Sequence, residues 1–533
     1  MSTILNGIGV GQVPVVAEVF QVEPAQTLPP FGKSQTDAAT EQQILTVAIG
    51  RVSDHFSKLS HHSDSDAVEI FEALDSLLKD EALFETSVKF IEQGWSAASS
   101  FGLAVEEFCE LLGEDPVFAE RAADLLDISN RVQASIAGIE TTLKLPQSGS
   151  FVIVANSLSP ADTAQFNAAV VGVITATGGP TSHTAIICRS MGIPAIFGVE
   201  NCASLENGTS VLLDPLADRI VVGGTVAEAT QPLKFADTGR TSLIPVRANI
   251  GSLVDAEAAA AANSDGVGLL RTEFLYLNQK TAPSVDSQKE LYRKLLQASP
   301  TGPVIVRTFD PELDKSIEFL PMPTSELARR YRVLELYPEI LTRQLEALEL
   351  ARIESDREVW VMAPMIGSAS EAEQFVKLAR TIGSFRVGVM VELPELVAEL
   401  PRLSGLVDFI SVGTNDLSQY LFSANRTEGS NHAELSFWQP ELIRSLAEIA
   451  KHCRVASIHS SVCGESASDP AFAVLLAGLG FDAVSVSTSQ VERVRSALAA
   501  VTPDQASLLA SAVLSANSSG QTKSAALATL SAF

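Results

Sequence analysis

The spacing of apolar and polar positions changes along the chain, and these changes divide it into regions. Alternation with a period of two, together with glycines, predicts one or two strands between residues 7 and 22. From residue 37 to 143 apolar residues recur at helical spacing, as at Val68, Phe71 and Leu74, which predicts an all-helical block. Strand-like runs then return at 151–155, 170–175, 210–213 and 219–222. We therefore expect a multidomain protein that begins with an α/β domain (residues 1–30 and 144–225) interrupted by a helical insert (residues 31–143).

Beyond a linker expected at residues 226–242, short apolar runs alternate with helical stretches. The strand-like runs lie at 244–248, 266–270, 304–307, 359–363, 386–391, 409–413, 457–463 and 483–486. Eight such units over about 290 residues are typical of a (β/α)8 barrel, which we expect to occupy residues 243–533.

Polar residues that would be awkward in a core follow several of the predicted barrel strands. In such barrels the carboxyl ends of the strands meet at one rim, so these residues are expected to form one site. They are Arg271, Arg307, Glu392, Asn415, Asp416 and Cys463. Glu392 and Asp416 could share a cation, and all-oxygen ligands favour Mg²⁺ or Mn²⁺. The guanidinium groups, with Arg426 and Lys315 further along the chain, suit a small anion that carries several charges.

A second candidate for chemistry is His183. It follows Gly178-Gly179-Pro180-Thr181-Ser182, which favours a sharp turn and then the start of a helix, and an apolar helical face comes after it. The first turn of a helix attracts anions and disfavours an imidazolium, so a neutral ring there could accept a phosphoryl group. The alternative interpretation is a histidine that only packs or caps the helix.

Composition narrows the class of partner. The 533 residues carry a formal net charge of −27, which argues against nonspecific binding to nucleic acid and favours a protein partner that is basic where it docks. We expect the acidic residues of the helical insert on a solvated face. The five cysteines lack CxxC spacing, so neither a disulfide framework nor a zinc site is expected. Without an apolar run of transmembrane length or a charged leader segment, a cytoplasmic protein with no membrane insertion is expected.

The motifs resemble those of the phosphoenolpyruvate-utilising enzymes. Gly-Gly-x-Thr-Ser-His183-x-Ala-Ile is similar to their phosphohistidine signature. Gly-Val-Gly-Leu-Leu-Arg271-Thr-Glu-Phe, Met-Val-Glu392, Val-Gly-Thr-Asn415-Asp416 and Val-Cys463-Gly-Glu resemble the barrel motifs of Enzyme I of the bacterial sugar phosphotransferase system. Only about 150 residues precede the phosphohistidine segment, and no Gly-rich phosphate loop is evident. Enzyme I is therefore favoured over the nucleotide-dependent relatives, and ATP is not expected as the phosphoryl donor.

The resemblance implies a phosphoenolpyruvate–protein phosphotransferase with a swivelling phosphohistidine domain. His183 would take the phosphoryl group, Thr163 would hydrogen-bond near it, and Cys463 would protonate the enolate as pyruvate forms. Glu392 and Asp416 would bind Mg²⁺, or Mn²⁺ in its place. Phosphoenolpyruvate would be held by Arg271, Arg307, Arg329, Asn415, Asp416 and Arg426. The helical insert would dock the histidine-containing phosphocarrier protein HPr, which starts sugar uptake, and the barrel would form a homodimer.

Two departures from the family pattern lie after Arg307. The family shows Asp-x-Gly-Gly-Asp-Lys where this chain reads Asp310-Pro311-Glu312-Leu313-Asp314-Lys315. The loss of both glycines could stiffen this loop. The following stretch is shortened, and either Arg329 or Arg330 matches the family's next arginine. These departures leave open an alternative, a non-catalytic relative that senses phosphoenolpyruvate and docks a partner.

Overall fold

The structure is a computed structural model. It describes residues 3–11, 13–22, 28–60, 65–112, 119–139, 141, 143–179, 182–231, 233, 235, 239–273, 281–309, 337–422 and 436–533. The chain divides near residue 232 into two compact units, which are described separately below.

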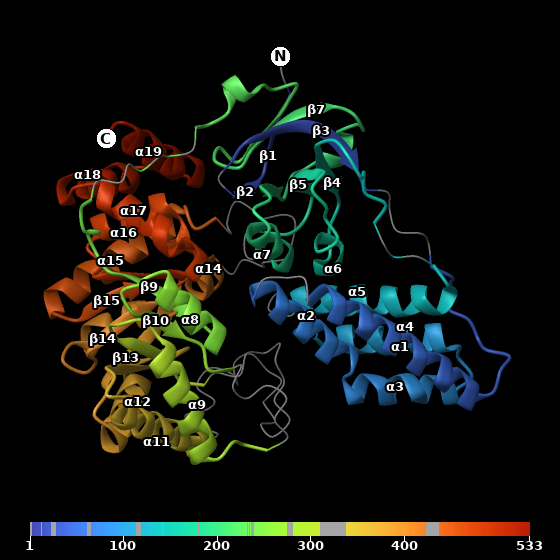
Figure 1. Cartoon of the computed structure of the whole chain (residues 1–533), viewed down its shortest axis with the longest axis horizontal. Coiled ribbons are helices and arrows are strands. Elements are labelled where there is room, and N and C mark those ends of the chain that lie inside the picture. Colours follow the sequence, from blue (N-terminus) through green and yellow to red (C-terminus); the bar gives the residue numbers. More distant parts are fainter. Residues whose placement is uncertain are drawn as a thin grey trace. The chain divides into compact units, whose positions relative to one another are not determined.

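The first unit contains an eight-stranded sheet with the strand order β1-β8-β7-β3-β4-β5-β6-β2 (Figure 1). The pairs β3–β4, β4–β5 and β5–β6 are parallel, and the other neighbouring strands of this sheet are antiparallel. Successive side chains of β4 point to opposite faces of the sheet, so this strand contributes to the apolar cluster on each face. Val152 and Val154 belong to one cluster, and Ile153 belongs to the other. The strands are β1 (Ile4–Asn6), β2 (Ile8–Val10), β3 (Val15–Gln21), β4 (Phe151–Ala155), β5 (Val170–Thr175), β6 (Ala195–Phe197), β7 (Ser210–Asp214) and β8 (Arg219–Val222).

Between β3 and β4 the described residues form a helical bundle with an apolar core that includes Phe56, Phe71 and Phe101. Its helices are α1 (Ala38–Ser60), α2 (Ser65–Leu78), α3 (Glu81–Glu92), α4 (Ala97–Leu112) and α5 (Ala119–Ala137). The same core takes in Ala161 of α6 (Pro160–Thr163) and Ile187 of α7 (His183–Ser190). The bundle is therefore packed against the two short helices that follow β4 and β5.

The second unit is a closed barrel of eight parallel strands in the order β9 to β16 (Figure 1). Along β12, Val359 and Val361 face the surrounding helices, while Trp360 and Met362 belong to the cluster inside the barrel. The strands are β9 (Val246–Ile250), β10 (Val267–Leu270), β11 (Val304–Arg307), β12 (Val359–Ala363), β13 (Arg386–Val391), β14 (Phe409–Val412), β15 (His459–Val462) and β16 (Ala483–Ser487).

Helices separate and follow the barrel strands. They are α8 (Leu253–Ala261), α9 (Val285–Ala298), α11 (Pro338–Ser355), α12 (Ala369–Ile382), α13 (Pro394–Ala398), α14 (Thr414–Phe422), α15 (Pro440–Ala456), α16 (Pro470–Leu479), α17 (Val491–Ala500), α18 (Pro503–Leu514) and α19 (Ser519–Ser531). Within the described ranges no single helix has both the length and the apolar character needed to cross a bilayer. One pair bent by 100°, Thr488–Ala500 with Pro503–Leu514, passes the same length and composition criteria together.

An aromatic and cationic cluster fills the barrel where its strands begin. The Trp360 ring has the Arg247 guanidinium 5.1 Å and the Arg386 guanidinium 5.0 Å from its centroid, and the His459 ring meets it edge-on at 5.2 Å. Burial lowers the pKa of His459 to about 4, and the nearby charge of Arg247 acts in the same direction. This end of the barrel is thus packed, as is usual for the face opposite the active site.

The predicted fold class, an α/β domain with a helical insert followed by a (β/α)8 barrel, is confirmed. The expectation of one or two strands in residues 7–22 is confirmed, because β2 and β3 lie there. Strand β1, at Ile4–Asn6, was not predicted. Strand β6 was also missed, because a run of three residues is too short to show a period.

Candidate active site

His183 is the first residue of α7, as the sequence predicted. Ser182 is the N-cap, and its Oγ accepts a hydrogen bond from the Ala185 amide at 3.3 Å. The turn before the helix uses Gly178 at φ +91°, a backbone conformation that glycine adopts without strain. Ala185 packs under the sheet while Ile187 enters the core of the bundle, so α7 is held from two sides.

The imidazole of His183 faces a carboxylate from the helical bundle. Its Nδ1 lies 3.4 Å from Oδ2 of Asp124, which is on α5 and has a side chain only 12% exposed. We had expected the acidic residues of the insert on a solvated face, and for Asp124 this was wrong. The partner could not be found from the sequence, because the two residues are about 60 positions apart and belong to different elements.

Further along α5, Arg131 joins the bundle to α6. Its Nε donates to Asp127 at 2.7 Å, and its Nη2 donates to Ser159 Oγ at 2.7 Å and to Asp162 at 2.8 Å. The Arg131 side chain is only 5% exposed, so these contacts lie in a partly dehydrated interface. The side chains on this face of α5 therefore contact both α6 and α7.

Thr163 lies at the end of α6 and is fully buried. Its Oγ1 donates to the carbonyl of Ser159 at 2.9 Å. The neighbouring loop is tied to α7, since Thr184 Oγ1 donates to the Leu158 carbonyl at 2.8 Å. These contacts bring the segment that contains Thr163 next to the first turn of α7, and its predicted hydrogen bond to the histidine stays a prediction.

In the barrel, the described candidate residues follow the carboxyl ends of the parallel strands. Arg271 comes after β10, Arg307 ends β11, Glu392 comes after β13, and Cys463 comes after β15. Asn415 and Asp416 lie in the first turn of α14, directly after β14. The Oδ1 of Asn415 accepts from the Glu465 amide at 3.1 Å, which joins α14 to the loop that follows Cys463.

Glu392 is a buried carboxylate at this rim. Its side chain is buried, and its Oε2 accepts a hydrogen bond from the Met365 amide at 2.8 Å. A Cβ on Gly413 would lie 2.8 Å from Glu392 Oε1, so a glycine is needed for the chain to pass the carboxylate. Among the described residues no group of three His, Cys, Asp or Glu side chains could hold a metal. A pair of carboxylates that leaves the remaining positions to substrate oxygens and water is nevertheless the pattern that suits Mg²⁺.

Arg307 is buried and paired. Its Nη2 lies 3.1 Å from Oε2 of Glu273, whose side chain is also buried. Arg271, two residues before this glutamate, is partly exposed. Glu273 lies in the segment that follows the predicted strand at 266–270, but its ion pair with Arg307 was not predicted. A sequence can assign strand-end residues to one rim without showing which of them contact each other.

Cys463 lies inside the barrel among these groups. Burial raises the pKa of its thiol to about 11, and the negative charge of Glu392 acts in the same direction. Arg307 and Arg271 oppose the rise, which places both arginines within electrostatic reach of the sulfur. The Sγ points to the Val412 carbonyl at 3.5 Å. A thiol held in its protonated form at neutral pH can donate a proton to a carbanion.

Several predicted site residues lie outside the described residues. They are Lys315, Arg329, Arg330, Arg426 and the segment 310–315, which differs from the family pattern. Their assignments stay predictions.

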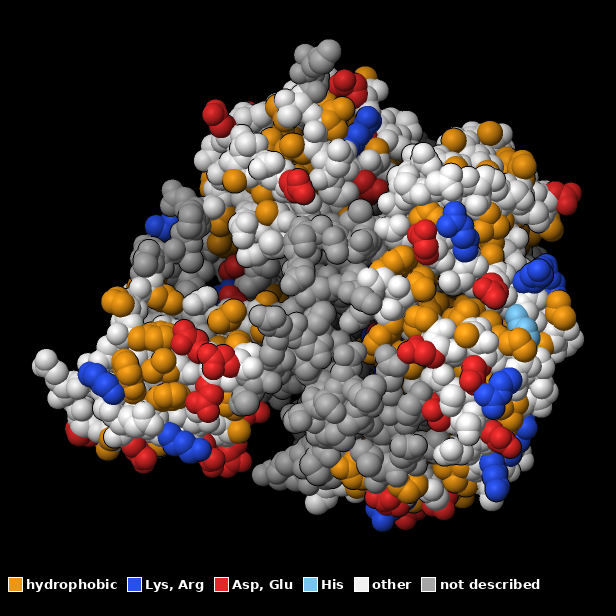
Figure 2. Space-filling view, turned by 180° about the vertical axis from the view of Figure 1, so that it is seen from behind, with side chains coloured by type: hydrophobic (Ala, Val, Ile, Leu, Met, Phe, Trp, Pro, Cys, Tyr) orange, Lys and Arg blue, Asp and Glu red, His pale blue; other side chains and the backbone are white. Residues whose placement is uncertain are grey.

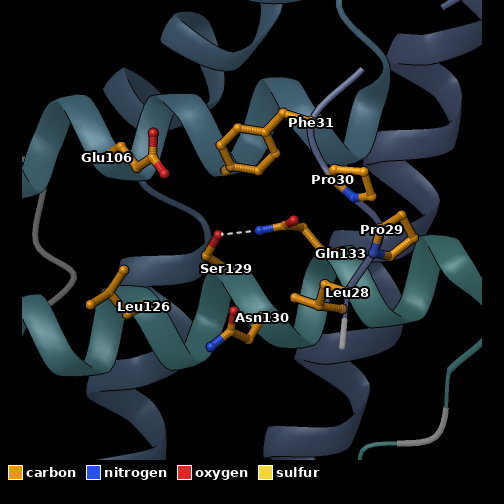
Figure 3. Close-up of a pocket in the computed structure, with 10 residues that line it drawn as sticks. Leu28, Pro29, Pro30, Phe31, Glu106, Leu126, Ser129, Asn130 and Gln133 are labelled. Carbon is orange, nitrogen blue, oxygen red and sulfur yellow. Dashed lines mark hydrogen bonds between the residues drawn. The ribbon is translucent and has the colours of Figure 1, made fainter. Parts of the chain in front are cut away.

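A groove of about 350 Å³ lies elsewhere on the helical bundle (Figure 3). It is bounded by the segment Leu28–Phe31 and by side chains of α4 and α5, with Gln133 donating to Ser129 at 2.9 Å on its floor. Because a helix turns 100° per residue, Leu126 and Asn130, which line this groove, lie on the side of α5 opposite Asp124. The groove is therefore separate from the histidine site.

Three segments of the chain match family models of phosphoenolpyruvate-utilising enzymes. They are the N-terminal domain over residues 3–121, the mobile domain over 148–217 and the PEP-binding domain over 227–502. A phosphoenolpyruvate-protein phosphotransferase of Streptomyces coelicolor is 33% identical over 558 residues, covering 100% of both proteins. The chain belongs to the phosphoenolpyruvate-utilising enzymes.

Other relatives in this family match over nearly the whole chain. A phosphoenolpyruvate-protein phosphotransferase of Haloferax volcanii is 32% identical and covers 97% of this chain and 98% of its own. One of Borreliella burgdorferi is 29% identical and covers 98% of this chain and 97% of its own. The match to the mobile domain contains His183. The match to the PEP-binding domain contains the rim residues from Arg271 to Cys463.

Proposed function

We propose that this chain is a phosphoenolpyruvate–protein phosphotransferase that works in two half-reactions. The observation that carries the proposal is the group of buried guanidinium, carboxylate and thiol side chains at the rim of the barrel. Together they match the chemical needs of an enol phosphate that must lose its phosphoryl group and gain a proton. His183, at a helix start in the same chain, provides the nitrogen that would receive the phosphoryl group.

In the first half-reaction the lone pair of His183 Nε2 attacks phosphorus, and the bond from phosphorus to the enol oxygen breaks. The electron pair stays on the departing enolate, and the Cys463 thiol delivers a proton to its methylene carbon to give pyruvate. Arg271 and Arg307 neutralise the phosphate and carboxylate of the substrate and hold them in position. Mg²⁺, or Mn²⁺ in its place, would be held by Glu392 and Asp416 and would neutralise charge on the phosphate oxygens.

We infer that Asp124 favours Nε2 as the nitrogen that carries the phosphoryl group while α7 lies against the bundle. Its Oδ2 is 3.4 Å from Nδ1, and a carboxylate can only accept hydrogen bonds, so the contact favours the tautomer with the proton on Nδ1. The lone pair then remains on Nε2.

In the second half-reaction the phosphoryl group passes from His183 to a histidine of the carrier HPr. The acidic helical bundle supports docking of a basic partner, since four of its five described helices carry more acidic than basic residues. Figure 2 shows acidic side chains spread over the visible surface of the bundle, at the lower left. By resemblance we also propose that the protein works in the cytoplasm, starts sugar uptake and pairs through its barrel.

Pyruvate release tests this proposal. Mixing the protein with phosphoenolpyruvate and Mg²⁺ should release close to one pyruvate per chain, and adding HPr should convert this burst into steady turnover. His183→Ala should bind phosphoenolpyruvate without releasing pyruvate. Binding without a burst in the unaltered protein would instead favour the sensing relative.

A further inference from the structure

Gln344 is a polar residue in an otherwise apolar layer between the barrel and its helices. It lies on α11, its side chain is fully buried, and its neighbours on the helix, Leu341, Leu345 and Leu348, belong to the main core. Burying an amide costs free energy unless its hydrogen bonds are replaced. The partners of this side chain therefore indicate what it does.

Each polar atom of the Gln344 amide has a partner. The Nε2 group lies 3.1 Å from Thr272 Oγ1 and 3.0 Å from the Tyr292 hydroxyl, and it donates to both. The Oε1 accepts from the Phe309 amide at 2.8 Å. Since a backbone N–H can only donate, the Phe309 contact fixes which end of the amide is oxygen.

The contact with Thr272 continues to the active site. Thr272 Oγ1 donates to the Arg307 carbonyl at 3.0 Å, because a carbonyl can only accept. The hydroxyl must therefore accept from Gln344, and the chain of donors runs from Gln344 through Thr272 to Arg307. Thr272 directly follows Arg271, so one buried amide connects the ends of β10 and β11.

We propose that Gln344 is a positioning residue that sets the spacing of Arg271 and Arg307 for phosphoenolpyruvate. The inference rests on the proposed function and adds to it the group that holds the anion-binding strand ends in register. Two guanidinium groups that must meet a phosphate and a carboxylate on one small substrate tolerate little displacement of the backbone that carries them.

Substitutions at each end of the network test this role. Gln344→Met keeps the volume but removes the donors and the acceptor, and Thr272→Val removes the link to Arg307. Each should raise the KM for phosphoenolpyruvate about tenfold, the effect of losing about one net hydrogen bond, while kcat changes less than about threefold. Tyr292→Phe is the matched control, because it removes the one bond of the same amide that leads to α9 and not to a strand end. Its KM should stay within about twofold of the unaltered value.

Three results would overturn the role: an unchanged KM in both Gln344→Met and Thr272→Val, an equal rise in Tyr292→Phe, or a fall in kcat alone. If Gln344→Met does not fold, Thr272→Val compared with Thr272→Ser decides, since serine keeps the hydroxyl and should recover most of the lost affinity. The dissociation constant of phosphoenolpyruvate with Mg²⁺, measured directly, separates this inference from the proposed function. If the unaltered protein binds phosphoenolpyruvate but transfers no phosphoryl group, the proposed function is contradicted, and the dissociation constants of the variants still test the role of Gln344. If the unaltered protein does not bind phosphoenolpyruvate, both the proposed function and the role of Gln344 are overturned.

Discussion

The contact between Asp124 and His183 joins helix α5 of the bundle to helix α7 of the α/β domain. His183 belongs to the mobile-domain match and Asp124 to the helical bundle. The contact therefore exists only while α7 is packed on the bundle. Because we propose that the bundle docks the carrier, Asp124 is expected to serve the carrier half-reaction rather than attack on phosphoenolpyruvate.

Asp124→Asn tests this division of roles. An asparagine can present either its oxygen or its NH₂ group to Nδ1, so it no longer enforces the reactive tautomer. We expect phosphoryl exchange between His183 and HPr to slow by about tenfold or more, while pyruvate release from phosphoenolpyruvate changes much less. Rapid-quench measurement of the two half-reactions separates them. Equal slowing of both would show that Asp124 acts at another step or only supports the fold.

At this scale the sequence predicted where the candidate residues lie in the fold better than it predicted their contact partners. Glu392 and Cys463 were identifiable because a predicted barrel places every strand end on one rim. Asp124, the pairing of Glu273 with Arg307, and the Gln344 network were not, because their partners are distant in sequence. Single-sequence patterns report periodicity within an element and carry no information on which elements meet.

Helix α5 is an element of the bundle that contacts both α6 and α7. Asp124, Asp127 and Arg131 recur at spacings of three and four, so they lie on one face of this helix. That face contacts His183 and Asp162, as well as pairing internally. The acidic pattern suggested a solvated surface, whereas this stripe is an interface between two elements.

Arg131→Met should loosen this interface. It leaves Asp127 and Asp162 without a buried cation, which typically costs about 3–5 kcal/mol. We expect a lower melting temperature for the first unit and faster amide hydrogen exchange in α5 and α6. Arg293→Met removes the ion pair with Glu290 on the exposed surface of α9, and this control should change the melting temperature little, because solvent screens the pair. If the two substitutions destabilise equally, the Arg131 contacts do not hold the elements together.

Elements were predicted best where the apolar runs were long. The strands at 151–155, 304–307 and 359–363 have the predicted bounds, because each is a continuous buried run with clear turns on both sides. Strand β1 was not predicted, because a run of three residues is too short to show a period.

For the whole molecule, the large negative charge and the anionic substrate are reconciled by local structure. The chain carries a net charge of −27, but the positive charges of Arg271 and Arg307 lie at one end of the barrel, where they can attract an anion. The opposite end is filled by the cluster around Trp360, where the partly buried His459 lies 3.4 Å from Arg247. That cluster makes the stability of the molecule depend on pH.

His459 should lower stability as the solution becomes acidic. Its folded pKa of about 4 lies below the ordinary value of 6.5, so between these two values the unfolded chain binds a proton that the folded chain does not. The folded state therefore loses stability as pH falls through this window, by at most about 1.4 kcal/mol per pH unit. Between pH 7 and pH 4 the free energy of unfolding of the unaltered protein should fall relative to that of His459→Gln, by no more than roughly that slope. A constant difference across this range would contradict the assignment.

The most direct test of the account is phosphorylation of His183 itself. The protein would be incubated with phosphoenolpyruvate labelled in its phosphoryl group and Mg²⁺, then digested, and the peptide that contains His183 would be isolated. We predict label on this peptide that is stable to base and labile to acid, released pyruvate in equal amount, no label from ATP, and no label in His183→Ala. Binding of phosphoenolpyruvate without label on His183 would contradict the central claim.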